Sequence, residues 1–142
     1  MEFHSFLCRI CNGKLVPGLN EVKCSNCGFI EHPVKETNFK INTDELKRKI
    51  EKKEDFLVLD VREKWEHSMV NIKDSVLIPM RELKEKINNL DKNKLVITLC
   101  HHGIRAAYAA RYLLQNGFKN VKCLEGGIDA WASKIDNSLR RY

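Results

Sequence analysis

The sequence predicts an α/β protein, in which a parallel sheet with helices on both faces follows a small cysteine-rich module. Three observations predict this fold. Short apolar runs alternate with amphipathic segments from about residue 43 onward, as in parallel sheets whose strands are joined by helices. The run FLVLDV (56–61) is almost continuously apolar, which is typical of a strand covered on both faces. Four of the six cysteines fall before residue 28, in two C-x2-C pairs.

The cysteines of the N-terminal module have the spacing of a metal site. Two C-x2-C pairs separated by twelve residues can present four sulfurs tetrahedrally to one ion, and the expected ligands are Cys8, Cys11, Cys24 and Cys27. Since all four are cysteine, no coordination position stays open for water, which favours a structural Zn²⁺. Iron would use the same thiolates, but neither pair has the C-P-x-C-G form usual in rubredoxins. Over about residues 6–32 the module resembles a zinc ribbon.

We expect this zinc-ribbon module to span residues 1–35. A chain of this size buries too little apolar surface to fold unaided, so the metal is expected to stabilise it. Short strands are expected at 14–16 and 29–31, and Gly13 and Gly28 are expected to supply positive φ in the turns after the cysteine pairs. Two disulfides are the alternative use of these cysteines, which a reducing compartment disfavours.

A linker is expected over residues 36–42, because Pro33 and its polar neighbours favour an extended path. Asn42 and Glu45 then have the spacing of a capping box, which predicts a helix over DELKRKIEKK. The second domain is expected to cover residues 43–142.

The rest of this domain alternates between strands and helices. Strands are expected at FLVLDV, SVLIP, LVITLC and VKCLEG, and helices at RELKEKINNL and IRAAYAARYLLQNG. Gly117 is expected to end the second of these helices, and Gly126 and Gly127 to form a tight turn before a last helix. Active sites of parallel sheets lie beyond the carboxyl ends of the strands, and Cys100 lies at such an end.

Cys100 ends a strand and begins a tight loop that leads directly into a helix. The N–H groups of such a loop, together with the N-terminus of the helix, favour a negative charge on the sulfur. Cys100 is therefore predicted to be a nucleophilic thiolate, and Gly103 to let the backbone curl around it. Cys123 falls within a predicted strand and is expected to be buried and inert.

Four segments carry a resemblance to a known family. The span from about 41 to 142 resembles a single-domain rhodanese, a sulfurtransferase, through LVLDVRE (57–63), VLIP (76–79), CHHGIR (100–105) and GFKNVKCLEGGIDAW (117–131). The loop is similar to that of rhodaneses whose active site reads C-H-H-G-x-R. The resemblance implies that Cys100 accepts a sulfane sulfur as a persulfide and passes it to a second nucleophile.

The resemblance also implies roles for the neighbouring residues. The active-site loop would comprise His101, His102, Gly103, Ile104 and Arg105. Arg105 is expected to hold the shape of the loop or offset the thiolate charge, whereas the two histidines either flank its mouth or are solvated. Asp60 and Arg62 are expected near the same face, as a buried supporting pair rather than as catalytic groups.

Other residues are expected to have structural roles, or depart from the family pattern. Trp65 and Trp131 are expected to pack in the core or at its edge. Ala106 stands where the family often has Ser or Thr, so one helix-start hydroxyl is missing. MVNIKDS (69–75) replaces the usual G-H-I-x-G-A, which affects the local turn more than the chemistry.

Two other functions fit parts of the pattern. Phosphatases and arsenate reductases of related folds use C-x5-R, whereas four residues separate Cys100 from Arg105, and the tighter loop favours a smaller group such as a sulfane sulfur. The second alternative is a non-catalytic rhodanese-like scaffold whose zinc ribbon docks a protein or nucleic acid. The intact cysteine loop argues against it.

Composition limits the partners and the compartment. The formal net charge of +6 fits a lysine-rich solvated surface, and the chain shows no aromatic and basic stripe of the kind that binds single strands, so nucleic acid is not expected. No apolar run approaches the ~20 residues of a membrane span, and the N-terminus lacks the pattern of a secretory signal, so a cytoplasmic location is expected. The expected partners are a small sulfur donor, thiosulfate or a persulfide, and a thiol or sulfur-carrier protein as acceptor.

Overall fold

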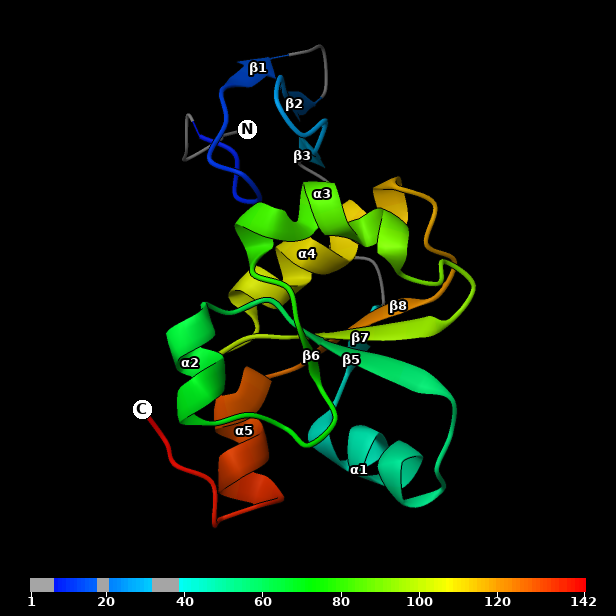
Figure 1. The fold of residues 1–142 in the computed structure, drawn as a ribbon, viewed down its shortest axis with the longest axis vertical. Helices are drawn as coiled ribbons and strands as arrows, with labels where there is room; N and C mark the ends of the chain where they lie inside the picture. Colours follow the sequence, from blue (N-terminus) through cyan, green and yellow to red (C-terminus); the bar gives the residue numbers. More distant parts are fainter. Residues whose placement is uncertain (1–6, 18–20, 32–38) are drawn as a thin grey trace.

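The larger part of the chain is built on a five-stranded sheet. The computed structural model describes residues 7–17, 21–31 and 39–142. All paired strands of this sheet are parallel, in the order β4-β8-β7-β5-β6 (Figure 1). The strands are β4 (Lys40–Ile41), β5 (Phe56–Asp60), β6 (Val76–Leu77), β7 (Leu95–Leu99) and β8 (Val121–Leu124). β5 and β7 pair along their full length, which brings Asp60 beside Leu99 at the carboxyl edge of the sheet.

Helices cover both faces of this sheet, so the predicted architecture is confirmed. They are α1 (Thr43–Glu51), α2 (Lys64–Met69), α3 (Leu83–Lys86), α4 (Ile104–Gln115) and α5 (Gly127–Lys134). α3 and α4 lie on one face, and α1 and α5 on the other (Figure 1). The alanines of α4 have no exposed surface at positions 106, 109 and 110, which allows this helix to pack closely on the sheet. Within the described residues, no helix is long and apolar enough to cross a bilayer.

Two elements differ from the expectations. The helix expected over 81–90 is divided into a 3₁₀ turn η1 (Met80–Glu82), α3 and a second 3₁₀ turn η2 (Ile87–Asn89). The apolar stripe still forms, because Leu83 and Ile87 are both buried, but the two asparagines of η2 favour a turn over continued helix. In the span expected to be a linker, residues 40–41 form β4 at the edge of the sheet.

The N-cap predicted at Asn42 is confirmed for the first helix. The Oδ1 atom of Asn42 accepts a hydrogen bond of 2.9 Å from the backbone N–H of Glu45. At the other end of the domain, Gly117 has a φ of 89° just after α4, as expected of a helix-terminating glycine.

The N-terminal module is a small antiparallel sheet with two cysteine-bearing turns. Its strands are β1 (Leu15–Pro17), β2 (Val22–Cys24) and β3 (Ile30–Glu31), in the order β1-β2-β3. The expected positive φ occurs at Gly28, with 79°, but the prediction for Gly13 is wrong, since Asn12 takes that conformation with 64°. At position 13 glycine is favoured by lack of space instead, because a Cβ there would lie 2.8 Å from the Cβ of Asn26.

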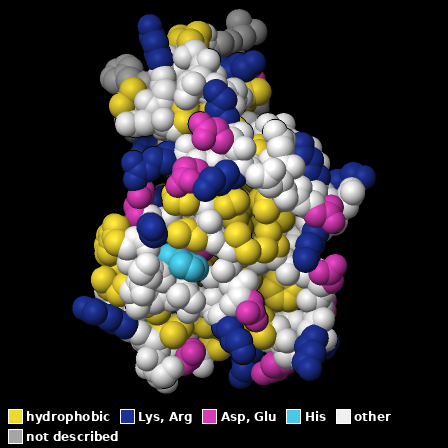
Figure 2. Space-filling model, in the orientation of Figure 1, with side chains coloured by type: hydrophobic (Ala, Val, Ile, Leu, Met, Phe, Trp, Pro, Cys, Tyr) yellow, Lys and Arg dark blue, Asp and Glu magenta, His cyan; other side chains and the backbone are white. Residues whose placement is uncertain are grey.

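The module packs against α4 and α3. Phe29 is 1% exposed and contacts the rings of Tyr108 and Tyr112, with centroid distances of 6.3 and 6.2 Å. The side-chain amide of Gln115 accepts from the N–H of Ile30 at 2.8 Å and donates to its carbonyl at 2.6 Å. The module therefore shares an apolar core with the larger part of the chain. On the face drawn in Figure 2, Lys and Arg side chains alternate with Asp and Glu and do not form one basic patch.

Candidate active site and metal centre

Cys100 lies where β7 ends and the loop to α4 begins. Its Sγ accepts hydrogen bonds from the backbone N–H of Gly103 at 3.0 Å and of Ala106 at 3.3 Å. Gly103 has a φ of 106°, which turns the chain back over the sulfur. Ala106 lies in the first turn of α4, where an N–H has no partner within the helix and is free to bind an anion. Cys100 as a whole is 1% exposed.

The first turn of α5 supports the loop through backbone contacts. The N–H of Ile128 donates to the carbonyl of Cys100 at 2.8 Å, and the N–H of Asp129 to the carbonyl of His101 at 3.1 Å. A Cβ at Gly127 would overlap both of these carbonyl groups. The glycine pair was expected to form a turn, but the requirement for glycine at 127 depends on this contact with the loop.

Arg105 is held by a carboxylate that the sequence did not identify. Glu66 in α2 is 4% exposed and accepts from both terminal nitrogens of Arg105, at 2.8 and 2.9 Å. It also accepts from the backbone N–H of Glu63 at 2.9 Å, which completes a capping box at the start of α2. The E-x-x-E spacing of residues 63–66 was the available signal in the sequence.

This ion pair fixes the charges beside the loop. Burial would raise the pKa of Glu66, but hydrogen bonds from Arg105 and from the backbone N–H of Glu63 lower it to about 2. The hydrogen bonds from Glu66 raise the pKa of Arg105 above its usual value. Arg105 therefore closes the loop as one half of a charge pair, and main-chain N–H groups contact the sulfur directly.

Asp60 and Arg62 form a second pair at the carboxyl end of β5. Neither side chain has exposed surface, and Nε and Nη2 of Arg62 reach the Asp60 carboxylate at 2.9 and 2.8 Å. Arg62 also donates to the carbonyl of Val70 at 2.6 Å, and His67 lies 2.8 Å from Asp60 through Nδ1. Burial lowers the pKa of Arg62, but the Asp60 carboxylate outweighs this effect and raises it.

Three aromatic rings are stacked next to the cysteine. The rings of His101 and His102 lie 3.9 Å apart, and Tyr142 stacks on the other face of His101 at 4.0 Å, with an interplanar angle of 9°. Burial lowers the pKa of His101, and the neighbouring His102 lowers it further. Ile104, in contrast, is 71% exposed at the start of α4.

The two tryptophans differ in burial. Trp131 is 7% exposed and packs in the core, as expected, whereas Trp65 is 59% exposed. The Trp65 ring meets the Tyr142 ring in an edge arrangement, with a centroid distance of 5.9 Å. Its exposure shows that Trp65 does not pack in the core. Cys123 is 2% exposed, as expected of a buried strand residue.

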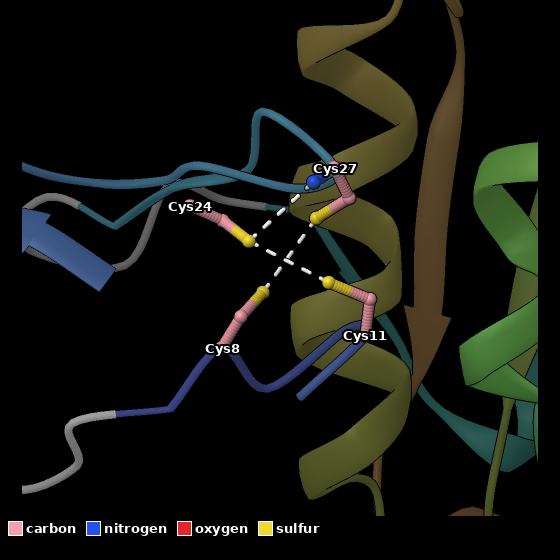
Figure 3. A group of neighbouring side chains, drawn as sticks. All are labelled: Cys8, Cys11, Cys24 and Cys27. Atoms are coloured by element: carbon pink, nitrogen blue, oxygen red, sulfur yellow. Dashed lines mark hydrogen bonds between the residues drawn. The ribbon is translucent and has the colours of Figure 1, made fainter. Parts of the chain in front are cut away.

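The four cysteines of the N-terminal module point their sulfurs toward a common centre beside α4 (Figure 3). All four sulfurs lie within 4.8 Å of one another, and the Cys8–Cys27 and Cys11–Cys24 pairs are 3.6 and 3.5 Å apart. A tetrahedron of sulfurs about 2.3 Å from a zinc ion has edges of about 3.8 Å, so the cluster fits such an ion.

Backbone N–H groups support negative charge on these sulfurs. Cys8, Cys11 and Cys24 accept from the N–H groups of Ile10, Gly13 and Asn26, at 3.3, 3.4 and 3.4 Å respectively. Thiolates are the ligand form of cysteine, so the donor set as well as the spacing fits a metal ion bound by four sulfurs.

Comparison with known proteins identifies the family of the larger domain. The family model described as "Rhodanese-like domain" matches residues 42–134, about two thirds of the chain. The chain belongs to the rhodanese-like family. The match begins after the cysteine cluster, so the cysteine-rich N-terminal module lies outside it.

Named relatives agree with this assignment. The putative sulfurtransferase YtwF of Bacillus subtilis is 41% identical over 91 residues, which cover 64% of this chain and 87% of YtwF. The thiosulfate sulfurtransferase GlpE of Coxiella burnetii is 35% identical over 80 residues, covering 56% of this chain and 75% of GlpE. A crystal structure of a rhodanese-related protein from Thermoplasma volcanium aligns with a TM-score of 0.62 and 38% identity, covering 68% of this chain and 92% of that protein.

Some rhodanese-like relatives are longer. The putative sulfur carrier protein YrkF of Bacillus subtilis is 33% identical over 96 residues, and the match covers 68% of this chain. The chain spans 52% of YrkF.

Proposed function

We propose that this protein is a rhodanese-type sulfurtransferase of the C-H-H-G-x-R subgroup, which carries a sulfane sulfur as a persulfide on Cys100. The observation that carries the proposal is the pair of main-chain N–H groups, of Gly103 and Ala106, that meet at the Sγ atom. Because these donors are fixed by the loop and by α4, they stabilise a sulfur anion without reorganisation. The names of YtwF and GlpE support sulfur transfer as the general activity.

The proposed reaction consists of two displacements at sulfur. With thiosulfate as donor, the Cys100 thiolate attacks the outer sulfur, the S–S bond of thiosulfate breaks, and sulfite leaves with the bonding electron pair. In the second step, an acceptor thiolate attacks the outer sulfur of the Cys100 persulfide, and the original thiolate leaves. Each step begins and ends with an anion at position 100, so the same donors serve both steps.

The residues around Cys100 have supporting roles in this proposal. Arg105, paired with Glu66, holds the end of the loop, and the Asp60–Arg62 pair holds the ends of β5 and α2 that face it. We propose that His101 and His102 flank the mouth of the loop and contact the donor or acceptor there. The proposed reaction gives neither of these stacked histidines a proton to transfer.

The proposed partners are a small sulfane donor and a nucleophilic acceptor. Thiosulfate is the donor in the name of GlpE, and the name of YrkF supports a sulfur-carrier protein as one class of acceptor. The reaction needs reduced thiols, so we propose that the protein works in the cytoplasm, where thiols are kept reduced.

Intact-mass analysis tests the proposal. The protein is incubated with thiosulfate, and separately with glutathione persulfide, and we expect the mass of one sulfur atom to be added at Cys100. Cys100→Ser should gain nothing and stay folded. Cys123→Ser is the matched control, because it removes the other buried cysteine of the same domain, and it should gain the sulfur normally.

The burial of Cys100 favours a second candidate function, a non-catalytic rhodanese-like scaffold whose ribbon docks another macromolecule. A folded wild-type protein that gains no sulfur from either donor would support the scaffold and overturn the sulfurtransferase. A persulfide that forms on Cys100 and disappears when a thiol is added would exclude the scaffold.

We further propose that residues 1–35 form a zinc-ribbon module holding one structural Zn²⁺, with the rhodanese-like domain at 43–142 and a linker at 36–42. Cys8, Cys11, Cys24 and Cys27 fill a tetrahedral site and leave no position for substrate, so the ion would stabilise the fold. Elemental analysis of the purified protein tests this, with one zinc per chain expected. Iron with a visible absorption band would assign a rubredoxin-like site instead.

A further inference from the structure

Tyr142 makes an unusual set of contacts for a residue far from the cysteine loop in sequence. Its hydroxyl accepts from Nη1 of Arg62 at 2.9 Å and donates to Oε1 of Glu66 at 2.8 Å. Its ring stacks on His101, and the guanidinium of Arg62 lies 5.9 Å from the ring centroid. One side chain thus contacts the residue after Cys100 and one member of each of the two ion pairs.

The two pairs have no direct contact with each other among the hydrogen bonds and ion pairs of the described residues. Arg62 donates hydrogen bonds to Asp60 and to the carbonyl of Val70. Glu66 accepts hydrogen bonds from Arg105 and from the N–H of Glu63. Among these contacts the Tyr142 hydroxyl is the group that joins the two pairs, because it accepts a hydrogen bond from Arg62 and donates one to Glu66. It therefore couples the end of β5 to the arginine that closes the loop.

We infer that Tyr142 is a positioning residue of the active site: through Glu66 it fixes Arg105, and through its ring it fixes His101, at the two ends of the segment that follows Cys100. This inference rests on the proposed sulfurtransferase function for its effect on rate. It needs no contact between Tyr142 and the sulfur. A hydroxyl that holds the carboxylate limits the positions open to Arg105, and a loop held in one geometry keeps the N–H groups of Gly103 and Ala106 on the sulfur.

The test separates the hydroxyl from the ring. Tyr142→Phe removes the bridge and keeps the stack on His101, whereas Tyr142→Leu removes both. We expect the single-turnover rate of persulfide formation from thiosulfate to fall about tenfold in Tyr142→Phe and further in Tyr142→Leu. Tyr108→Phe is the matched control, since it deletes the hydroxyl of a half-buried tyrosine on α4 outside this network, and it should react at the wild-type rate.

A double-mutant cycle distinguishes positioning from a general loss of stability. If Tyr142 acts through Glu66, adding Tyr142→Phe to Glu66→Met, which leaves no side-chain oxygen to accept from the hydroxyl, should cost much less than it costs in the wild-type background. Equal costs in the two backgrounds would overturn the inference. So would a Tyr142→Phe variant that reacts as fast as the wild type.

A second readout keeps the inference testable even if the proposed function fails. The folded protein is treated with iodoacetamide, and alkylation of Cys100 is then followed by mass spectrometry of the peptide that contains it. The rate of this alkylation depends on the loop geometry and not on a sulfur donor. We expect this rate to change in Tyr142→Phe and to stay constant in Tyr108→Phe. A wild-type protein that forms no persulfide would refute the sulfurtransferase, whereas an unchanged alkylation rate in Tyr142→Phe would refute the positioning role.

Discussion

Gly127 lies so close to Cys100 that a single added methyl group at Gly127 would overlap the Cys100 carbonyl oxygen. The next N–H along the chain, of Ile128, donates to that same oxygen at 2.8 Å. The start of α5 is therefore part of the support for the cysteine loop, although the two segments follow different strands, β8 and β7.

This contact predicts a large effect of Gly127→Ala. The backbone φ of 63° alone costs about 1–3 kcal/mol for a residue with a Cβ, and the overlap forces the loop to move as well. We expect lower unfolding free energy in urea and a loss of persulfide formation of at least about tenfold. Gly117→Ala is the control, because its φ of 89° brings the same kind of strain but its Cβ would meet only the Lys92 side chain, at 3.8 Å. Equal activity in the two variants would contradict the proposed support.

Loss of one of the proposed metal ligands should affect the N-terminal module more than the activity of the rhodanese-like domain. Cys24→Ser is expected to lose the bound metal and unfold the N-terminal module, while sulfur transfer continues at moderate temperature. Because Phe29 and Gln115 anchor the module to α4, we also expect a lower midpoint of thermal unfolding for the whole chain. Elemental analysis, calorimetry and thiosulfate turnover check these outcomes. An inactive Cys24→Ser protein whose residues 43–142 remain folded would show that the module is part of the active site.

The Glu66–Arg105 pair predicts a specific loss of stability in acid. The pKa of Glu66 is lowered from 4.5 to about 2, so the pair stabilises the folded state fully above pH 4.5 and loses this contribution as the pH falls toward 2. The shift corresponds to a contribution on the order of 3 kcal/mol. In urea titrations at a series of pH values, the unfolding free energy of the wild type should exceed that of Glu66→Gln most at neutral pH. The two unfolding free energies should converge near pH 2. A difference that stays constant across this range would show that the charge of Glu66 does not stabilise the fold.

The contact between Gln115 and Ile30 predicts an effect on metal retention. Gln115→Ala removes two hydrogen bonds that hold β3 against α4, so the module should open more often and release its metal to a chelator several-fold faster. Leu114→Ala is the control, because it removes a neighbouring side chain that is 39% exposed. Equal release rates in the two variants would indicate that the module opens independently of its contact with α4.

Local patterns were sufficient to predict most elements of the fold. The apolar run at 56–60, the capping spacing of Asn42 and Glu45, and the terminating Gly117 each depend on interactions within a few residues, and all appear where they were expected. The prediction of one helix over 81–90 was less accurate, because the apolar stripe of this segment fits both a continuous helix and a series of shorter turns.

The sequence by itself determined that a parallel sheet carries Cys100 at the end of a strand, and that four N-terminal cysteines have the spacing of a metal site. Strand periodicity, glycine positions and C-x2-C spacing are properties of short segments, so they can be read without a structure. Only the tertiary structure decided what surrounds Cys100. Glu66 meets Arg105 across 39 residues and Tyr142 meets Arg62 across 80, and contacts over such distances depend on how the strands and helices pack, which no local pattern records.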